Sequence, residues 1–239
     1  ILDGSMGFAS SSASNGNFAE KIKYFPNWAE NVAPVNAVNI ASVQPFGAQA
    51  EDDFIVMFAG NLGEAQDLVS VIQAAVLTKA HQRIKWVFLG EGRKKDTLIT
   101  MVKDHELEKT VFFPGRFPLS NMPTFMSHAS VLLFSLKDEA NFNVTVPSKV
   151  QFYMSQSKPI VAMLNGDGAA LISEARCGFS APAGNYRRLA ELIVNISEID
   201  GTELNEMGLN GKRFYEEHFR KEDRIVQLES IFFTECKKG

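Results

Sequence analysis

From Phe54 onward, short runs of apolar residues alternate with longer segments whose apolar residues recur at helical spacing. Apart from Lys85, every residue of the short runs is apolar, whereas a strand with one side in solvent alternates apolar and polar residues. Such strands, separated by amphipathic helices, are typical of a parallel sheet covered on both faces. Because crossovers are right-handed, we expect an α/β fold with a doubly wound parallel sheet. The predicted strands are residues 54–59, 85–89, 111–113, 131–134 and 160–163, with a weaker one around Phe179.

Helical spacing fills the intervals between these strands and continues to the end of the chain. Three predicted helices lie between the strands, and three apolar stripes follow Phe179, which predicts a helical C-terminal region. The intervening helices are indicated by Leu68, Val71, Ile72, Ala75 and Val76, by Leu98, Met101 and Val102, and by Met122, Phe125 and Met126. The three C-terminal stripes are Leu189, Leu192, Ile193 and Ile196, then Leu204, Met207 and Phe214, then Ile225, Leu228, Ile231 and Phe232.

The part before Phe54 has a different composition. Residues 1–23 are mostly small, polar and rich in Gly and Ser, and we predict a flexible leader or a cloning remnant. Residues 24–53 contain several prolines and no sustained periodicity, which indicates a connecting segment with an aromatic anchor. Residues 54–239 form the predicted folded domain. At this size a chain buries enough surface to fold without a disulfide or metal.

Charge and composition exclude several classes of function. The net charge is −4, from 24 basic and 28 acidic residues without a basic run, so we expect no nucleic-acid partner. Cys177, Cys236 and the four histidines are scattered, so we expect no metal site and free thiols in a reducing compartment. No apolar stretch approaches the ~18 residues of a membrane span, and no secretory signal is visible. We therefore expect a cytoplasmic protein.

The turns after the predicted strands are the expected ligand site, because ligands bind at the carboxyl ends of strands in open parallel sheets. The glycines of Gly60-Asn61-Leu62-Gly63 allow close approach of the backbone to a ligand, although the motif could equally be a tight turn. In Gly90-Glu91-Gly92-Arg93, Arg93 could contact a phosphate or be a solvated first-turn residue. Lys95 occupies the place of the third glycine of a dinucleotide fingerprint, so we expect no nicotinamide cofactor.

Two later turns carry further candidates. Pro114-Gly115-Arg116-Phe117-Pro118 predicts a rigid loop whose backbone could hydrogen-bond the edge of a base or simply turn the chain. Residues 138–149 form a polar segment ending in a helix that we expect Pro147 to begin, since proline tolerates the first helical position. The amides and dipole of that helix favour an anion, and Lys149 adds a cation. The alternative is a capped helix with a surface lysine.

Taken in order, these motifs resemble the C-terminal domain of bacterial family 4 glycosyltransferases, and more narrowly the branch that transfers sugars for capsule, O-antigen or colanic acid. The resemblance implies a GT-B architecture, in which two Rossmann-like domains face a cleft and the C-terminal one, here residues 54–239, binds a nucleotide sugar. The donor is commonly a UDP-sugar, and transfer usually retains the anomeric configuration without a metal or another cofactor. The resemblance is carried by Phe25-Pro26-Asn27-Trp28, Gly60-Asn61-Leu62-Gly63, Gly90-Glu91-Gly92, Gly115-Arg116-Phe117, Pro147-Ser148-Lys149 and Lys158-Pro159-Ile160-Val161.

The resemblance also assigns donor-binding residues to each turn. The Gly60–Gly63 turn would lie against the donor phosphates, the third turn would hold the base through its backbone, and the fourth would present amides to the diphosphate and sugar. The candidates are Gly60, Asn61, Gly63, Gly90 and Arg93, then Arg116 and Phe117, then Asn143, Val144, Thr145, Ser148 and Lys149.

The chain departs from the family pattern at four positions. Asn61 and Gln66 stand where the family has an arginine and a lysine. Val144 and Phe152 stand where it has two glutamates spaced eight apart, one of which binds ribose. We expect Lys149 and the helix amides to replace the missing cationic clamp and to stabilise the leaving diphosphate, on which charge accumulates as the glycosidic bond breaks.

The resulting hypothesis is the donor-binding part of a glycosyltransferase that transfers a hexosyl or N-acetylhexosaminyl group to a lipid-linked or polysaccharide acceptor. Its predicted partners are a nucleotide sugar and an N-terminal acceptor domain that this chain lacks; that domain would make any membrane contact, on the inner face. The chain alone is expected to show little or no transfer. Two alternatives remain open: a nucleotide-sugar 2-epimerase, which needs an acid and base pair of carboxylates, and a non-catalytic nucleotide-sugar-binding module.

Overall fold

The computed structural model describes residues 2–3, 23–25, 28, 39–48 and 52–236. Most of the predicted leader, residues 1–23, and of the connecting segment, residues 24–53, lies outside the described residues, including Pro26 and Asn27. Within these segments, strand β1 (Leu2–Asp3) pairs in parallel with β2 (Lys23–Tyr24). The short 3₁₀ helices η3 (Ile40–Ser42) and η4 (Phe46–Ala48) precede the domain.

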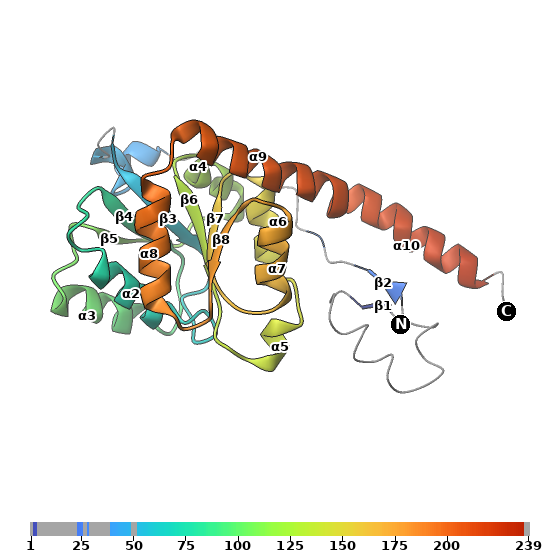
Figure 1. Ribbon diagram of the computed structural model, residues 1–239, viewed down its shortest axis with the longest axis horizontal. Coiled ribbons are helices and arrows are strands. Elements are labelled where there is room, and N and C mark those ends of the chain that lie inside the picture. The colour runs from blue at the N-terminus through green and yellow to red at the C-terminus, as the bar shows by residue number, and fades with distance from the viewer. Residues whose placement is uncertain (1, 4–22, 26–27, 29–38, 49–51, 237–239) are drawn as a thin grey trace.

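A six-stranded parallel sheet forms the centre of the domain, as the sequence predicts (Figure 1). Its strands lie in the order β5-β4-β3-β6-β7-β8, with the change in direction of winding between β3 and β6. This is the order of a doubly wound Rossmann-like sheet, whose ligand site is expected where the winding reverses. The strands are β3 (Phe54–Ala59), β4 (Ile84–Leu89), β5 (Val111–Gly115), β6 (Val131–Ser135), β7 (Ile160–Met163) and β8 (Gly178–Ala181).

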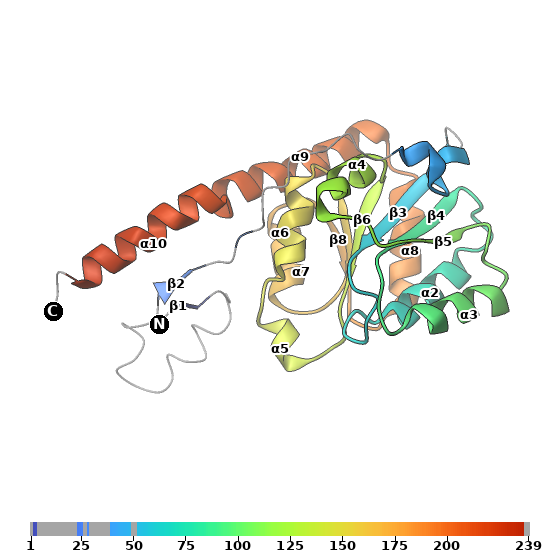
Figure 2. The ribbon, with the colours of Figure 1, turned by 180° about the vertical axis from the view of Figure 1, so that it is seen from behind.

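The side chains of the sheet feed two separate cores. All six residues of β3 are buried: Ile55, Met57 and Ala59 belong to one core, and the intervening residues to the other. This burial on both faces explains why the central strands carry uninterrupted apolar runs. Helices cover each face, as Figures 1 and 2 show from opposite sides. The first core is covered by α4 (Met122–Ser127), α6 (Ser148–Ser155), α7 (Asp167–Glu174) and α9 (Gly201–His218), the second by α2 (Leu68–Leu77), α3 (Lys95–Asp104) and α8 (Tyr186–Ser197).

The structure corrects two local predictions. Pro147 does not begin α6: its φ of −65° and ψ of 132° are extended, it is the N-cap residue, and the helix starts at Ser148. The ring of proline fixes φ but leaves ψ free, so the residue can precede a helix as well as start one. Pro114 and Gly115 are not part of a loop but end the edge strand β5, where the missing N–H of a proline is tolerated. The loop therefore begins at Arg116.

The segment after β6 also differs from the loop expected there. It contains a single helical turn, α5 (Ala140–Asn143), before Pro147 and α6. A 3₁₀ turn, η5 (Leu119–Asn121), likewise precedes α4. Both short elements lie after the carboxyl ends of strands, so they shape the loops around the predicted ligand site.

The C-terminal helices are not buried mainly through the apolar stripes from which they were predicted. Helix α9 approaches α6 through glycines: a Cβ on Gly208 would lie 2.2 Å from the carbonyl oxygen of Ser157. The predicted stripe of α9, in contrast, is only half-buried. The last helix, α10 (Lys221–Cys236), extends beyond the sheet in Figure 1, and its Val226 and Phe232 are exposed. Apolar periodicity therefore identified these helices without showing which faces are covered.

Candidate functional site

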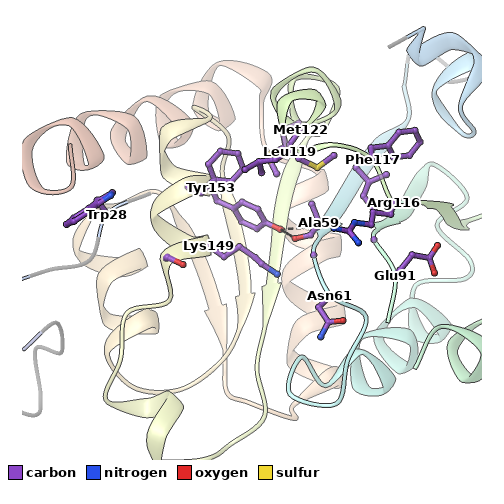
Figure 3. A pocket seen from close by; sticks show the side chains of 16 residues that line it. Trp28, Ala59, Asn61, Glu91, Arg116, Phe117, Leu119, Met122, Lys149 and Tyr153 are labelled. Atoms are coloured by element: carbon purple, nitrogen blue, oxygen red, sulfur yellow. Dashed lines mark hydrogen bonds between the residues drawn. The ribbon is translucent and has the colours of Figure 1, made fainter. Parts of the chain in front are cut away.

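A cavity of about 680 Å³ lies at the carboxyl ends of β3 and β4 and under the first turns of α6 (Figure 3). Its floor comes from the ends of the strands, and its walls come from α6 and from the loop between β5 and α4. A cavity of this size is within the usual range for a small-molecule or cofactor site. The lining residues are Trp28, Ala59, Gly60, Asn61, Leu89, Gly90, Glu91, Arg116, Phe117, Leu119, Met122, Met126, Ser148, Lys149, Phe152 and Tyr153.

Two glycines form the closest approach between neighbouring loops at the edge of the cavity. Gly60 has a φ of 155° and Gly90 a φ of 144°, and a Cβ on Gly90 would lie only 1.8 Å from the carbonyl oxygen of Gly60. Backbone hydrogen bonds keep the loops in place: the Gly60 amide donates to Leu89 at 2.8 Å and the Gly90 amide donates to Gly115 at 2.8 Å. Backbone atoms, rather than side chains, therefore form this part of the cavity surface.

Lys149 carries its ammonium group to the same place. Its Nζ lies 4.6 Å from the centre of the Phe58 ring and 5.8 Å from that of Phe134, within range of cation–π attraction. A Cβ on Gly60 would lie 2.1 Å from this nitrogen, so the glycine makes room for it. Burial lowers the pKa of Lys149 to about 8. Among the described residues no carboxylate pairs with Lys149, so its charge is available to a ligand anion.

Tyr153 fixes the position of Lys149 by tying α6 to β3. Its buried hydroxyl accepts a hydrogen bond from the amide of Ala59 at 3.0 Å and donates one to the carbonyl oxygen of the same residue at 3.2 Å. Tyr153 lies one helical turn after Lys149, on the same face of α6. The last residue of β3 and the second turn of α6 are thus joined directly beside the cavity.

Replacing Tyr153 with phenylalanine is expected to lower the free energy of unfolding by about 1–3 kcal/mol, because the Ala59 amide would be buried without a partner. Urea denaturation checks this value. The control is Tyr186→Phe, which makes the same change on the partly exposed α8 and is expected to be close to neutral. An unchanged midpoint for Y153F would show that the hydroxyl does not hold α6 in place.

Two other lysines near the strand ends, Lys94 and Lys137, are already paired. Glu64, in the loop after β3, contacts Lys94 at 2.7 Å and Lys137 at 2.5 Å. Hydrogen bonds from Lys137 and then from Lys94 lower the pKa of this carboxyl to about 2. Glu64 thereby joins the loops that follow β3, β4 and β6. Both lysines share this one carboxylate, whereas no carboxylate among the described residues pairs with Lys149.

Two features are absent from the described part of the chain. No three side chains of histidine, cysteine, aspartate or glutamate come together there as a group that could hold a metal ion. No helix there has both the length and the apolar character needed to cross a bilayer.

Comparison with known protein families identifies the chain at the level of its fold and family. Residues 42–214 match the family described as "Glycosyl transferases group 1". The chain belongs to this family. The predicted resemblance to bacterial glycosyltransferases of the surface-polysaccharide branch and the predicted Rossmann-like fold are both confirmed.

Two curated glycosyltransferases and one solved structure show how far the similarity extends. The probable glycosyltransferase WbjE of Pseudomonas aeruginosa is 31% identical over 155 residues, which are 63% of this chain and 37% of WbjE. The putative colanic acid biosynthesis glycosyltransferase WcaL of Escherichia coli K12 is 24% identical over 192 residues, 80% of this chain and 47% of WcaL. The chain thus spans less than half the length of these two relatives.

The structural similarity is higher than the sequence identity suggests. Anabaena Alr3699/HepE, solved in complex with UDP, superimposes with a TM-score of 0.80 at 18% identity, over 98% of this chain and 63% of HepE. At this identity the similarity shows a shared fold.

Seven of the predicted donor-binding residues of this glycosyltransferase chain line the cavity. They come from three separate loops, those after β3, β4 and β5, and from the helix α6, which the sheet brings together at its carboxyl edge. These residues are Gly60, Asn61, Gly90, Arg116, Phe117, Ser148 and Lys149.

The other five predicted residues lie outside the cavity lining. Asn143 donates to Asp138 at 2.9 Å, and the Thr145 hydroxyl donates to the Asn141 carbonyl at 3.1 Å. Val144 and Arg93 are exposed, and Gly63 lies beside the Asn61 side chain. For these positions, donor binding stays a prediction.

Sequence reasoning missed Tyr153, although its place in α6 offered a signal. An aromatic residue four positions after a candidate ligand lies on the same helical face and is therefore directed toward the same strand ends. The contact of the Lys149 ammonium with two aromatic rings had no comparable signal. Phe58 and Phe134 are separated along the chain from Lys149 and from one another.

Proposed function

We propose that this chain binds a nucleotide diphosphate sugar, with a UDP-sugar as the favoured donor, and is the donor-binding part of a sugar-transferring enzyme. The observation that carries this proposal is the Lys149 ammonium, which pairs with no carboxylate of the described residues and is held against Gly60 at the start of α6 inside the cavity. A cation, the free amides of a helix N-terminus and a glycine backbone together form a site suited to phosphate groups.

The arrangement of the lining residues supports an orientation for the donor. The diphosphate would lie between the Gly60 loop and the first turn of α6, where Ser148 and Lys149 are placed. The base would lie toward Phe117 and Met122 on the opposite, more apolar wall. HepE was solved with UDP and with UDP-glucose, which supports a UDP-sugar as the first ligand to test.

In the proposed reaction, the bond between the anomeric carbon and the diphosphate oxygen breaks, and the diphosphate leaves with the electron pair. An acceptor hydroxyl forms the new bond to the anomeric carbon and loses its proton. Lys149 and the amides of α6 would stabilise the charge that grows on the leaving oxygen. The acceptor would be lipid-linked or a polysaccharide, the transferred group a hexose or N-acetylhexosamine, and the outcome retention.

The acceptor and its binding groups belong to the whole protein in this proposal. The matched segments are 37% of WbjE and 47% of WcaL, and the remaining length supports a second domain that supplies them. The present chain is then expected to bind the donor but to show little or no transfer. Robust transfer by this chain alone would contradict that division of roles.

One observation bears on the two alternative functions. Among the described residues the cavity is lined by a single carboxylate, that of Glu91, which pairs with Lys95 at 2.6 Å. A 2-epimerase needs an acid and a base facing the sugar, so this lining favours transfer. A non-catalytic module would bind donor equally well, and an assay for sugar transfer by a parent protein with both domains distinguishes it.

The direct test is isothermal titration of the chain with UDP, GDP and dTDP, followed by UDP-glucose and UDP-N-acetylglucosamine. Binding of UDP is expected, and it should also raise the melting temperature, because a ligand that binds only the folded state stabilises it. The absence of saturable binding by all five compounds would overturn the proposal.

The affinity for UDP is also expected to depend on pH through Lys149. The charged form that binds phosphate predominates below its pKa of about 8 and is lost above it. Affinity should therefore fall by about 30-fold between pH 7 and pH 9.5, from the titration of one group. Titration across this range checks the value, with Lys149→Met as the control, since it should show a flat profile. A flat profile in the unmodified chain would exclude the role of Lys149.

A further inference from the structure

Arg116 is the second cationic side chain that lines the cavity. It follows the last residue of β5, and in Figure 3 it extends into the cavity from the wall opposite Lys149. The residue is exposed, and no hydrogen bond or ion pair to its guanidinium group occurs within the described ranges. An arginine directed into a pocket without a carboxylate partner leaves five N–H donors for a ligand.

The neighbouring carboxylate does not take up this charge. Glu91 lies beside Arg116 at the edge of the cavity, and its oxygen would be 3.7 Å from a Cβ on Gly115. It is instead paired with Lys95, the first residue of α3. Lys95 thus keeps Glu91 from neutralising Arg116.

A diphosphate needs more positive charge than Lys149 provides. Each of its phosphates carries a negative charge at neutral pH, whereas Lys149 contributes at most one positive charge. A guanidinium group stays charged at any physiological pH, and its planar fork matches two phosphate oxygens at once. Lys94 and Lys137, at the ends of adjacent strands, are paired with Glu64 and do not line the cavity.

Building on the proposed function, we propose that the Arg116 side chain contacts the phosphates of the nucleotide from the wall opposite Lys149. The diphosphate would then be bound between two cations from different parts of the fold, the loop after β5 and the first turn of α6. This role differs from the backbone contact to the base that the family resemblance assigns to Arg116, because it depends on the guanidinium group itself.

The test compares UDP, which contains a nucleobase, with inorganic pyrophosphate, which does not. Titration of the whole chain with UDP and with inorganic pyrophosphate is repeated for Arg116→Gln and Arg116→Lys, with Arg213→Gln on α9 as the matched control. Arg116→Gln is expected to weaken both ligands by about 10- to 100-fold, the usual range for a charge-assisted hydrogen bond. Arg116→Lys should recover part of this loss, and Arg213→Gln should change neither affinity.

The outcomes separate this proposal from the one on which it rests. If Arg116→Gln weakens UDP but not pyrophosphate, the side chain contacts the base and the proposal is overturned. Unchanged affinity for both ligands overturns it as well, while UDP binding and its dependence on Lys149 would stand. Failure of the unmodified chain to bind either ligand would instead overturn the proposed function. Melting curves of each variant show whether the fold is retained.

Discussion

Replacing Lys149 with alanine or methionine is expected to reduce the affinity for UDP at least about 100-fold, a loss of about 3 kcal/mol of binding free energy. The reason is the environment of the ammonium group: it is desolvated, lies on two aromatic rings and, in the part of the chain that the structure describes, has no carboxylate to compete with a phosphate. Charge-assisted contacts in such surroundings are stronger than those on an open surface. Isothermal titration with UDP at pH 7 measures the loss.

The same substitution should act in the opposite direction on stability. Burial lowers the pKa of Lys149 from 10.5 to about 8, so the unfolded chain binds the proton more tightly than the folded chain. Protonation of this lysine therefore opposes folding, and the stability of the unmodified chain should rise as pH increases between about 8 and 10.5. Lys149→Met removes this cost, so its free energy of unfolding at pH 7 is expected to equal or exceed that of the unmodified chain.

Lys158 provides a matched control for both measurements. It is a second partly buried lysine whose pKa is lowered by burial. It lies just before β7, at the amino ends of the strands and away from their carboxyl ends, and it does not line the cavity. Lys158→Met should leave UDP affinity unchanged. Equal losses of affinity in the two variants, or retained binding in Lys149→Met, would show that the phosphates do not bind at α6.

Replacing Gly90 with alanine is expected to destabilise the fold by about 3–5 kcal/mol. The new Cβ would meet the carbonyl oxygen of Gly60 at 1.8 Å, and the alanine at position 90 would have to adopt a φ of 144°. Backbone strain and forced displacement of packed atoms each cost about 1–3 kcal/mol. The obstructing atom belongs to the backbone of the loop that follows β3. Rotation of a side chain therefore does not relieve the overlap. Urea denaturation measures the effect.

Gly60→Ala should have a different consequence, although its φ of 155° is similar. Its Cβ would meet the Nζ of Lys149 at 2.1 Å, which is the mobile end of a long side chain. The lysine side chain can move, so the fold should be largely retained. The ammonium group, however, would lose its contact with the Phe58 ring. We expect loss of UDP affinity with a smaller loss of stability than in Gly90→Ala.

Gly201→Ala is the control for this pair. Gly201 begins α9, and a Cβ there would meet no atom within 4 Å. It should leave both UDP affinity and the fold intact and could stabilise the helix by up to about 1 kcal/mol. Equal stability of the Gly90 and Gly201 variants would contradict the proposed contact between the two glycine loops.

Sequence patterns predicted much of the domain because the segments that are rich in apolar residues are also the segments that the folded protein buries. Every residue of β3 is apolar and buried, so the run at residues 54–59 was informative by itself. The edge of the sheet was less predictable. Pro114 and Gly115 are turn-forming residues by composition, yet they belong to β5, because an edge strand tolerates a missing hydrogen-bond donor.

The candidate site was predicted in part for a similar reason. Glycines after strands and a lysine at a helix start have local signatures, and Gly60, Gly90 and Lys149 do line one cavity. Asn143 and Thr145 have equally polar signatures but are engaged in hydrogen bonds within their own segment. Sequence alone does not distinguish a polar group directed to a ligand from one satisfied by its neighbours.

By itself, the sequence determined the fold class, the succession of strands and helices, and the turns in which ligand-binding residues were to be sought. These follow from periodicity and turn chemistry, which act over a few residues. Only the tertiary structure decided that the Lys149 ammonium lies on Phe58 and Phe134, that Tyr153 ties α6 to Ala59, and that the Gly60 and Gly90 loops touch. Those contacts join residues 15 to 94 positions apart, and they depend on how the strands are ordered in the sheet, which no local pattern encodes.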